Sequence, residues 1–269
     1  MSLFDSHCHL DRFFHEGILD QVLSRAEVAG VNRMVAIGTE PNDWSIYSEL
    51  AKTYSKTIAY TVGLHPNEVG SEWEKNLENV KSLLFSDPAP VAIGEIGLDY
   101  FRLPKKESKA GLLKDLQKIA FANQLNIARE AELPVVIHCR ESFEDCITMI
   151  DESAIDWNKV VFHCFSEGPT ELKQLCERGG RASFTGIITY GNAEKVREAA
   201  IAQGLDALML ETDCPYLSPE PLRGKPNEPA HLLHTAVFCA DLFNTDLKTL
   251  STLTSDNAHA FYGLTKESP

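Results

Sequence analysis

The chain has 269 residues, of which 43% are hydrophobic and 24% are charged, and its formal net charge is −14. This composition is typical of a globular protein with a sizeable core, and no apolar run approaches the roughly 20 residues that a membrane-spanning helix needs. The acidic balance excludes a broad basic surface for nucleic acid, but it leaves a phosphate-bearing substrate possible, because bound divalent ions can reverse the local field.

The first predicted element is a strand over residues 3–9, which contains His7 and His9. Side chains alternate along a strand, so both imidazoles lie on one face, about 6.6–6.8 Å apart along the strand. Two imidazoles so placed can bind one transition-metal ion. They can also be polar residues where a strand meets solvent, and the pair alone does not decide between these interpretations.

Short apolar or β-branched runs recur along the chain, with amphipathic segments between them. One segment places Trp44, Tyr47, Leu50, Ala51 and Tyr54 on a single helical face. Alternating strands and helices predict right-handed βαβ units, and eight such units at this length favour a (β/α)8 TIM barrel over an open doubly wound sheet. The runs lie at residues 3–9, 34–37, 58–64, 91–96, 135–138, 160–163, 182–184 and 207–211.

A second amphipathic segment is predicted to bury a face made of Leu112, Leu113, Leu116, Ile119, Ala120 and Ile127. No Gly-, Ser- or Pro-rich linker divides the chain, so residues 1–269 are expected to form a single domain. The Pro-rich residues 215–229 are predicted to form a long loop after the eighth strand, and such loops are often functional. Helical regions near residues 230–243 and 247–262 complete the predicted barrel.

Side chains that bind metals stand near the ends of several predicted strands. Glu95 is placed at the end of the fourth strand, His138 and His163 end the fifth and sixth, and Asp213 ends the eighth. Singly, each can be a hydrogen-bonded structural residue or a helix cap. In a barrel these ends meet at one mouth, where active sites lie. With the N-terminal histidine pair they can hold two divalent ions bridged by Glu95, an arrangement that suits hydrolysis by an activated water.

Four cysteines directly follow candidate ligands. Because alternation turns the residue after a lumen-facing one toward the helices, these cysteines are predicted to be buried structural thiols; they are Cys8, Cys139, Cys164 and Cys214. The seven cysteines lack the spacing of a disulfide framework, and no secretory signal is seen, so a reduced cytoplasmic protein is expected. Histidines outside the pattern are given no catalytic role; these are His15, His231, His234 and His259.

The candidate ligands and the residues around them form several short sequence motifs. They are Asp5-Ser6-His7-Cys8-His9-Leu10, Gly63-Leu64-His65-Pro66, Gly94-Glu95-Ile96-Gly97-Leu98-Asp99-Tyr100, Ile137-His138-Cys139-Arg140, Phe162-His163-Cys164-Phe165-Ser166, Ser183-Phe184-Thr185-Gly186, Glu211-Thr212-Asp213-Cys214-Pro215-Tyr216-Leu217 and Arg223-Gly224-Lys225-Pro226-Asn227-Glu228-Pro229. In this order they resemble the TatD-type metal-dependent deoxyribonucleases, within the amidohydrolase-like metal-dependent hydrolases.

The resemblance implies a (β/α)8 fold and hydrolysis of phosphodiester bonds in DNA, with exonuclease action as the mode. The implied ligands of two divalent ions are His7, His9, Glu95, His138, His163 and Asp213. In our hypothesis His7, His9 and Asp213 hold one ion. His138 and His163 hold the other, with Glu95 shared. Glu95 and Asp213 are the catalytic carboxylates, and Asp213 also orients or deprotonates the attacking water.

Substrate contacts are expected from His65, after the third strand, and from three loop cations, Arg102, Arg140 and Arg223. For each arginine taken alone, a solvated surface charge or a local ion pair explains its presence as well as a phosphate contact does. The imidazole-rich ligands favour zinc or manganese, while phosphoryl chemistry commonly uses magnesium. DNA is the expected partner, with no membrane contact, and the protein is expected to be a monomer or a weak oligomer.

Two positions depart from the family pattern. Glu167-Gly168 stands where relatives usually have Gly and a small polar residue, and a carboxylate there would repel DNA unless it points away or meets a cation. Asn67 stands where many relatives have a further histidine. Two other functions stay open: hydrolysis of a small ester, lactone or amide, which the same metal set can activate, and a non-catalytic adaptor with a relic site. The complete ligand set argues against the relic.

Overall fold

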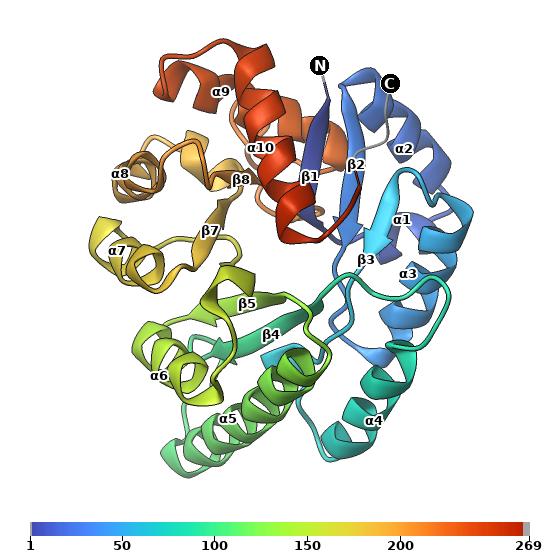
Figure 1. The fold of residues 1–269 in the computed structure, drawn as a ribbon, viewed down its shortest axis with the longest axis vertical. Coiled ribbons are helices and arrows are strands. Elements are labelled where there is room, and N and C mark those ends of the chain that lie inside the picture. The colour runs from blue at the N-terminus through green and yellow to red at the C-terminus, as the bar shows by residue number, and fades with distance from the viewer. Residues whose placement is uncertain (1, 266–269) are drawn as a thin grey trace.

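In the computed structural model, which describes residues 2–265, eight parallel strands alternate with helices along the chain (Figure 1). Each of the eight predicted runs overlaps one strand, so the predicted strand order is confirmed. The strands are β1 (Leu3–Cys8), β2 (Val31–Ala36), β3 (Ile58–Tyr60), β4 (Ile93–Asp99), β5 (Val135–Arg140), β6 (Val160–Phe162), β7 (Arg181–Phe184) and β8 (Met209–Leu210).

Backbone hydrogen bonds join these strands into a barrel. They form two parallel groups, β1-β2-β3 and β4-β5-β6-β7-β8. A parallel bridge between Val62 and Ile93 links the first group to the second. On the other side the amide of Asp213, just beyond β8, donates to the carbonyl of His7 in β1 at 2.9 Å. The strands therefore close into the predicted (β/α)8 barrel.

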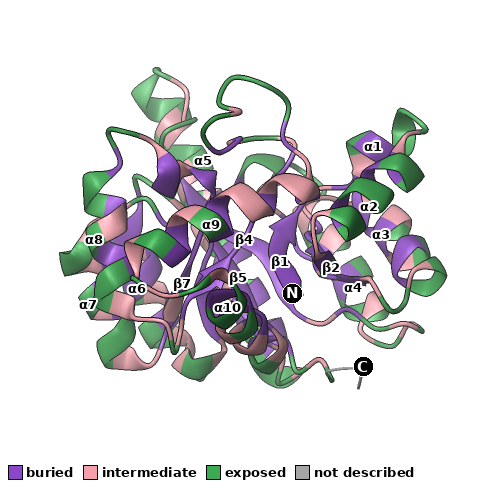
Figure 2. Cartoon of the chain, turned by 90° about the horizontal axis from the view of Figure 1, so that it is seen from above, coloured by how far each residue is buried: buried purple, intermediate pink, exposed green. Residues whose placement is uncertain are grey.

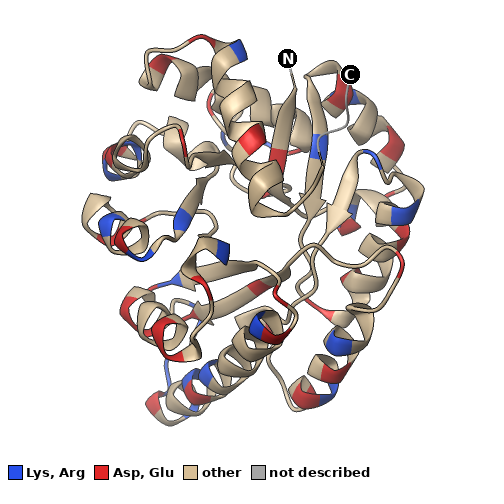
Figure 3. Cartoon of the chain, in the orientation of Figure 1, with Lys and Arg blue, Asp and Glu red and all other residues tan. Residues whose placement is uncertain are grey.

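Helices surround the strands in chain order, and they are exposed on their outer faces and buried where they meet the barrel (Figures 1 and 2). Charged side chains lie mostly on these helices and their loops (Figure 3). The helices are α1 (Asp11–His15), α2 (Leu19–Val28), α3 (Pro41–Thr53), α4 (Trp73–Leu83), α5 (Glu107–Glu130), α6 (Phe143–Ser153), α7 (Pro169–Arg178), α8 (Glu194–Gln203), α9 (Leu232–Leu242) and α10 (Leu247–Phe261), with short 3-10 turns η1 (Pro66–Glu68), η2 (Trp157–Lys159), η3 (Gly186–Thr189) and η4 (Pro229–His231). Within residues 2–265 none of the helices combines the length and the apolar character needed to cross a membrane.

The interior of the barrel is a packed apolar core rather than a pore. Six strands contribute to it: β1, β2, β3, β5, β6 and β8 supply Phe4, Val35, Ala59, Val136, Val161 and Met209. Helix α10 covers this core with Phe261 and Tyr262, and the Tyr262 hydroxyl donates to the carbonyl of Ser6 at 2.8 Å. Because this end is filled, the C-terminal ends of the strands are left as the place for a site.

The predicted apolar face of α3 is confirmed, whereas that of α5 is right only for Ala120 and Ile127, which are buried. In α3, Trp44 and Tyr47 are buried at 1% and 0% exposure. In α5, Leu112 and Ile119 are 70% and 50% exposed, and the buried side instead carries Gln117 and other residues. Hydrophobic periodicity failed here because the buried face of α5 is partly polar.

Two glutamines on the buried face of α5 bind backbone groups beside the mouth of the barrel. Gln124 accepts from the Leu64 amide at 2.7 Å and donates to the Leu64 carbonyl at 3.0 Å. Gln117 does the same for Asp99, at 3.1 and 3.3 Å. Buried amide side chains are stable where every polar atom has a partner, and these two glutamines replace missing strand partners.

Not all predicted ligands stand at strand ends. Glu95 lies inside β4, which continues to Asp99, and His138 lies inside β5, two residues before its end at Arg140. Asp213 lies three residues beyond β8. Strand β4 extends past Glu95 because Gly97 approaches β5 closely: its φ is +142°, and a Cβ there would lie 2.0 Å from the carbonyl oxygen of His138. Only glycine fits this position.

The prediction for the four cysteines is right for two of them. Cys8 and Cys214 are buried. Cys139 and Cys164 are only partly buried and line the mouth. Cys139 stands next to the end of β5, and Cys164 lies beyond the end of β6 with a φ of +46°. Strand alternation no longer separates the barrel interior from the helical layer at such positions.

Candidate active site

A cavity of about 880 Å³ lies at the C-terminal ends of the strands. Five of the six predicted ligands line it, namely His9, Glu95, His138, His163 and Asp213. The sixth, His7, is fully buried beneath them. The fold therefore brings these side chains together at one mouth, as predicted, although they come from strands and loops that are distant in sequence.

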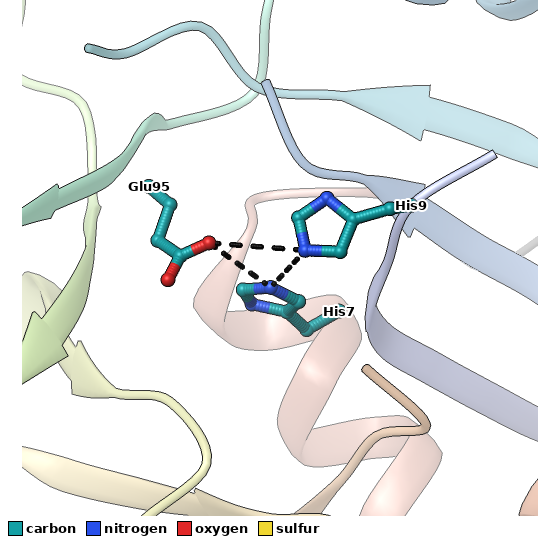
Figure 4. A group of neighbouring side chains, drawn as sticks. All are labelled: His7, His9 and Glu95. Atoms are coloured by element: carbon teal, nitrogen blue, oxygen red, sulfur yellow. Dashed lines mark hydrogen bonds and ion pairs between the residues drawn. The ribbon is translucent and has the colours of Figure 1, made fainter. Parts of the chain in front are cut away.

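Glu95 lies between two groups of histidines, and one of its oxygens faces the first group (Figure 4). Its Oε2 atom is 3.5 Å from Nε2 of His7 and 3.8 Å from Nε2 of His9. Oδ1 of Asp213 lies 3.6 and 3.3 Å from the same two nitrogens. The first group thus contains two imidazoles and two carboxylates.

The other oxygen of Glu95 faces the second group. Its Oε1 atom lies 2.6 Å from Nδ1 of His138 and 2.7 Å from Nε2 of His163. His65 approaches the same oxygen, with Nε2 at 3.5 Å. One carboxylate therefore contacts both groups, through a different oxygen in each.

In the first group the spacing of the donor atoms fits a bound divalent cation, whereas in the second group Oε1 of Glu95 is at hydrogen-bond distance from two imidazoles. Nε2 of His7 and Nε2 of His9 lie 3.3 Å apart. A tetrahedral ion bound at about 2.0–2.2 Å separates its ligand atoms by roughly 3.3–3.6 Å. Ligand atoms of His7, His9 and Glu95 all lie within 4.8 Å of one another, as do those of His65, Glu95 and His138. Imidazole and carboxylate together are donors for zinc and manganese.

The backbone partner of each imidazole decides what its other nitrogen can do. Nδ1 of His9 lies 3.2 Å from the carbonyl of Ile37, which can only accept, so in the neutral ring Nδ1 carries the proton and Nε2 is left with a lone pair. Nδ1 of His65 accepts from the amide of Asn67 at 3.1 Å, so the proton of neutral His65 is on Nε2. His9 is therefore suited to bind a cation, and His65 to donate a hydrogen bond.

Two buried carboxylates stand behind the histidines of the second group. Oδ2 of Asp99 lies 3.4 Å from Nε2 of His138 and accepts from Nδ2 of Asn67 at 2.9 Å. Oε1 of Glu211 lies 3.6 Å from Nδ1 of His163. Carboxylates in this position orient a ligating imidazole and raise its basicity.

Sequence reasoning gave Asp99 and Glu211 no role. The available signal was their position within the same strings, four residues after Glu95 and two residues before Asp213. Asn67, which replaces a histidine of many relatives, pairs with Asp99 and so belongs to the same support.

Burial and charge oppose each other throughout the site. Burial raises the pKa of Glu95, but the neighbouring imidazoles outweigh it and hold that pKa well below its usual range. Burial lowers the pKa of His9, but Asp213 and Glu95 outweigh it and raise that pKa to about 9. For His7, burial dominates and the pKa falls. Protons and a cation thus compete for the same nitrogen atoms.

The predicted substrate cations divide into two sets. Arg102 and Arg140 line the cavity, as His65 does. Arg223 does not line it: its guanidinium lies 4.1 Å from the ring centre of Tyr190, and its Nη1 is 4.0 Å from Glu220. Local partners thus hold Arg223 away from the ligands.

Glu167, the residue that departs from the family pattern, meets a cation. Its carboxylate lies 3.6 Å from Nζ of Lys195, and it is not among the residues that line the cavity. The repulsion of DNA considered from the sequence is therefore reduced.

The loop after β8 is held by one buried asparagine. Asn227, 1% exposed, donates to the carbonyls of Thr212 at 2.9 Å and Tyr216 at 2.6 Å, and its amide donates to the carbonyl of Pro215 at 3.1 Å. As predicted, this Pro-rich stretch is a loop without helix or strand up to η4. Its anchoring fixes the backbone on both sides of Asp213.

Comparison with known proteins gives consistent matches over nearly the whole chain. The family described as TatD related DNase matches residues 4–263. The uncharacterized metal-dependent hydrolase YabD of Bacillus subtilis is 32% identical over 262 residues, which cover 97% of this chain and 98% of that protein. The 3'-5' ssDNA/RNA exonuclease TatD of Erwinia amylovora is 34% identical over 250 residues, covering 91% and 93%. The crystal structure of the TatD homologue YjjV from Escherichia coli K12 has a TM-score of 0.88 at 26% identity, with 98% of both chains covered.

Proposed function

This chain belongs to the family of TatD-related DNases, and from that premise we propose that it is a divalent-metal-dependent deoxyribonuclease that acts as an exonuclease. It is a metal-dependent hydrolase of ester bonds, as its family and its relatives are. The name of the Erwinia relative, a 3'-5' ssDNA/RNA exonuclease, supports single-stranded ends as the substrate.

The observation that carries the proposal is the division of Glu95 between two groups of ligands. Oε2 faces His7 and His9, and Oε1 faces His138 and His163. This arrangement supports two ions with Glu95 shared between them, and Asp213 beside the first. Two ions about 3.5–4 Å apart stabilise both the attacking and the leaving oxygen in phosphodiester hydrolysis and lower the pKa of a bound water.

The protein's own residues then have distinct roles. The carboxylate of Asp213 accepts a proton from the attacking water and fixes its direction. Nε2 of His65 donates a hydrogen bond to an oxygen of the scissile phosphate, as its tautomer allows. Arg102 and Arg140 neutralise the charge that remains on the phosphate. Water adds to phosphorus, the phosphorus–oxygen bond to the sugar of the neighbouring nucleotide breaks, and that sugar oxygen takes up the proton that Asp213 accepted.

Release of nucleotides from end-labelled linear single-stranded DNA tests the proposal. We expect activity with added Mn²⁺, Mg²⁺ or Zn²⁺, its loss on chelation, and a fall of at least about 100-fold in His138→Ala. The matched control is His15→Ala, because His15 is exposed and does not line the cavity. Closed circular single-stranded DNA should stay intact, since an exonuclease requires an end.

Two results would overturn parts of this assignment. Cleavage of the closed circle would replace the exonuclease mode with an endonuclease one. Intact DNA, together with metal-dependent cleavage of small esters, lactones or amides, would refute the nuclease assignment and favour hydrolysis of a small substrate by the same site.

A further inference from the structure

Two aromatic side chains stand exposed on opposite rims of the mouth. Tyr216 is 62% exposed and lines the cavity three residues after Asp213. Phe101 is 56% exposed and does not itself line the cavity, but it lies between Asp99 and Arg102, which do. Strands β4 and β8 lie half-way round an eight-stranded barrel from each other. The metal-binding side chains therefore lie between the two rings.

The backbone that carries Tyr216 is anchored although its ring is exposed. Its amide donates to the carbonyl of Asp213 at 3.0 Å, and its carbonyl accepts from Asn227 at 2.6 Å. The ring centre lies 6.4 Å from that of His9, edge to face. Because the backbone that carries this ring is already fixed, binding has little backbone freedom left to remove, and this favours affinity.

The ring of Phe101 contacts a cation. The guanidinium carbon of Arg140 lies 3.8 Å from the ring centre of Phe101. Arg140 is the last residue of β5, two residues after His138, and it lines the cavity. Guanidinium planes and aromatic rings are the two protein surfaces on which unpaired nucleobases stack.

We propose that Tyr216 on one rim and the Phe101–Arg140 pair on the other are base-binding subsites for the unpaired nucleobases on either side of the scissile phosphate. The inference rests on the proposed nuclease function. The chain carries a net charge of −14, so attraction of phosphates by a basic surface is weak, and stacking provides affinity that does not depend on net charge. In a duplex, neighbouring base pairs cover both faces of each base, so these subsites select single strands.

Steady-state kinetics on single-stranded oligonucleotides tests the subsites. Tyr216→Ala and Phe101→Ala should each raise KM by on the order of 5- to 150-fold, the effect of one stacked base, with a smaller change in kcat. Tyr216→Phe, which keeps a stacking ring, should restore most of the affinity. Phe85→Ala is the matched control: Phe85 is 91% exposed, follows α4, does not line the cavity, and should leave KM unchanged.

Combining each variant with an altered substrate separates the loss of base stacking from a general disturbance of the cavity. Replacing a nucleotide next to the scissile phosphate by an abasic one should raise the wild-type KM by a similar factor, and Tyr216→Ala or Phe101→Ala should add little to that loss. If DNA is cleaved but the base and the ring contribute independently, or not at all, the subsites are refuted and the nuclease function stands. If the wild-type protein leaves DNA intact under all metals, both proposals fall.

Discussion

At the scale of single residues, the orientation of His138 shows how a neighbouring carboxylate selects a ligand atom. Nε2 of this ring faces Asp99 and Nδ1 faces Glu95, so Nδ1 is the nitrogen available to a cation. Burial raises the pKa of Asp99, but hydrogen bonds from His138 and Asn67 outweigh it and hold that pKa below its ordinary value. Asp99 is therefore an ionised acceptor that fixes the ring of His138.

Substitution Asp99→Asn tests this positioning role. The amide keeps the shape of the carboxylate but removes its charge, so His138 loses basicity and orientation, and affinity for Mn²⁺ or Zn²⁺ should fall about 10- to 100-fold. Calorimetric titration of the metal-free protein measures this effect directly. Asp115→Asn, at an exposed position of α5, makes the same charge change away from the site and serves as control. Equal affinity in the two variants would contradict the role of Asp99.

At the scale of elements, α5 acts as a clamp on the mouth of the barrel. Gln117 and Gln124 are seven residues apart, which places them on one face about two turns apart. Each pairs with both backbone groups of one residue, Asp99 for the first and Leu64 for the second. Leu64 precedes His65, so this helix fixes two segments that carry site residues. Its buried face is partly polar for this reason.

Replacing one of these glutamines by an apolar residue of similar size should lower the stability of the protein. In Gln124→Leu the amide and carbonyl of Leu64 lose their buried partner, so the free energy of unfolding should fall by about 2–4 kcal/mol. Urea denaturation measures it. Asn123→Leu is the control, because Asn123 is exposed on the same helix and bonds only to the carbonyl of Ile119 among described residues. If the free energy of unfolding falls no more than in the control, water satisfies the backbone groups of Leu64 in place of Gln124.

At the scale of the whole molecule, the site concentrates charge inside an already acidic protein. Glu95, Asp213 and Glu211 are largely buried near one another, against a net charge of −14. The histidines offset this charge only when protonated, whereas divalent cations offset it at any pH at which they bind. Cation binding is therefore expected to stabilise the fold.

The thermal midpoint should report this linkage. At a free concentration 100 times its Kd, each bound ion adds about 2.7 kcal/mol to the free energy of unfolding. For a chain of this size that corresponds to a rise in Tm of about 5–10 °C per ion relative to chelated protein. Calorimetry with and without Mn²⁺ measures it, and the double variant His7→Ala/His138→Ala should lose the shift. An equal Tm in both conditions would show that the site binds no cation in the folded state.

The sequence by itself determined the alternation of strands and helices, the barrel, and the six side chains that meet at its mouth. These follow from local periodicity and from the rule that parallel strands end at one mouth, so they needed no coordinates. It predicted the face of α5 only in part, because periodicity reports the burial of apolar groups and not of polar groups whose partners are distant backbone atoms.

Only the tertiary structure decided how the atoms of the site meet. It showed that Glu95 contacts each histidine group through a different oxygen, that backbone partners give His9 and His65 opposite tautomers, and that Asp99 supports His138. It also placed Arg223 away from the cavity. Except for the local hydrogen bond between Asn67 and His65, these facts depend on distances between residues far apart in the chain, and residue types and spacing carry no record of such distances.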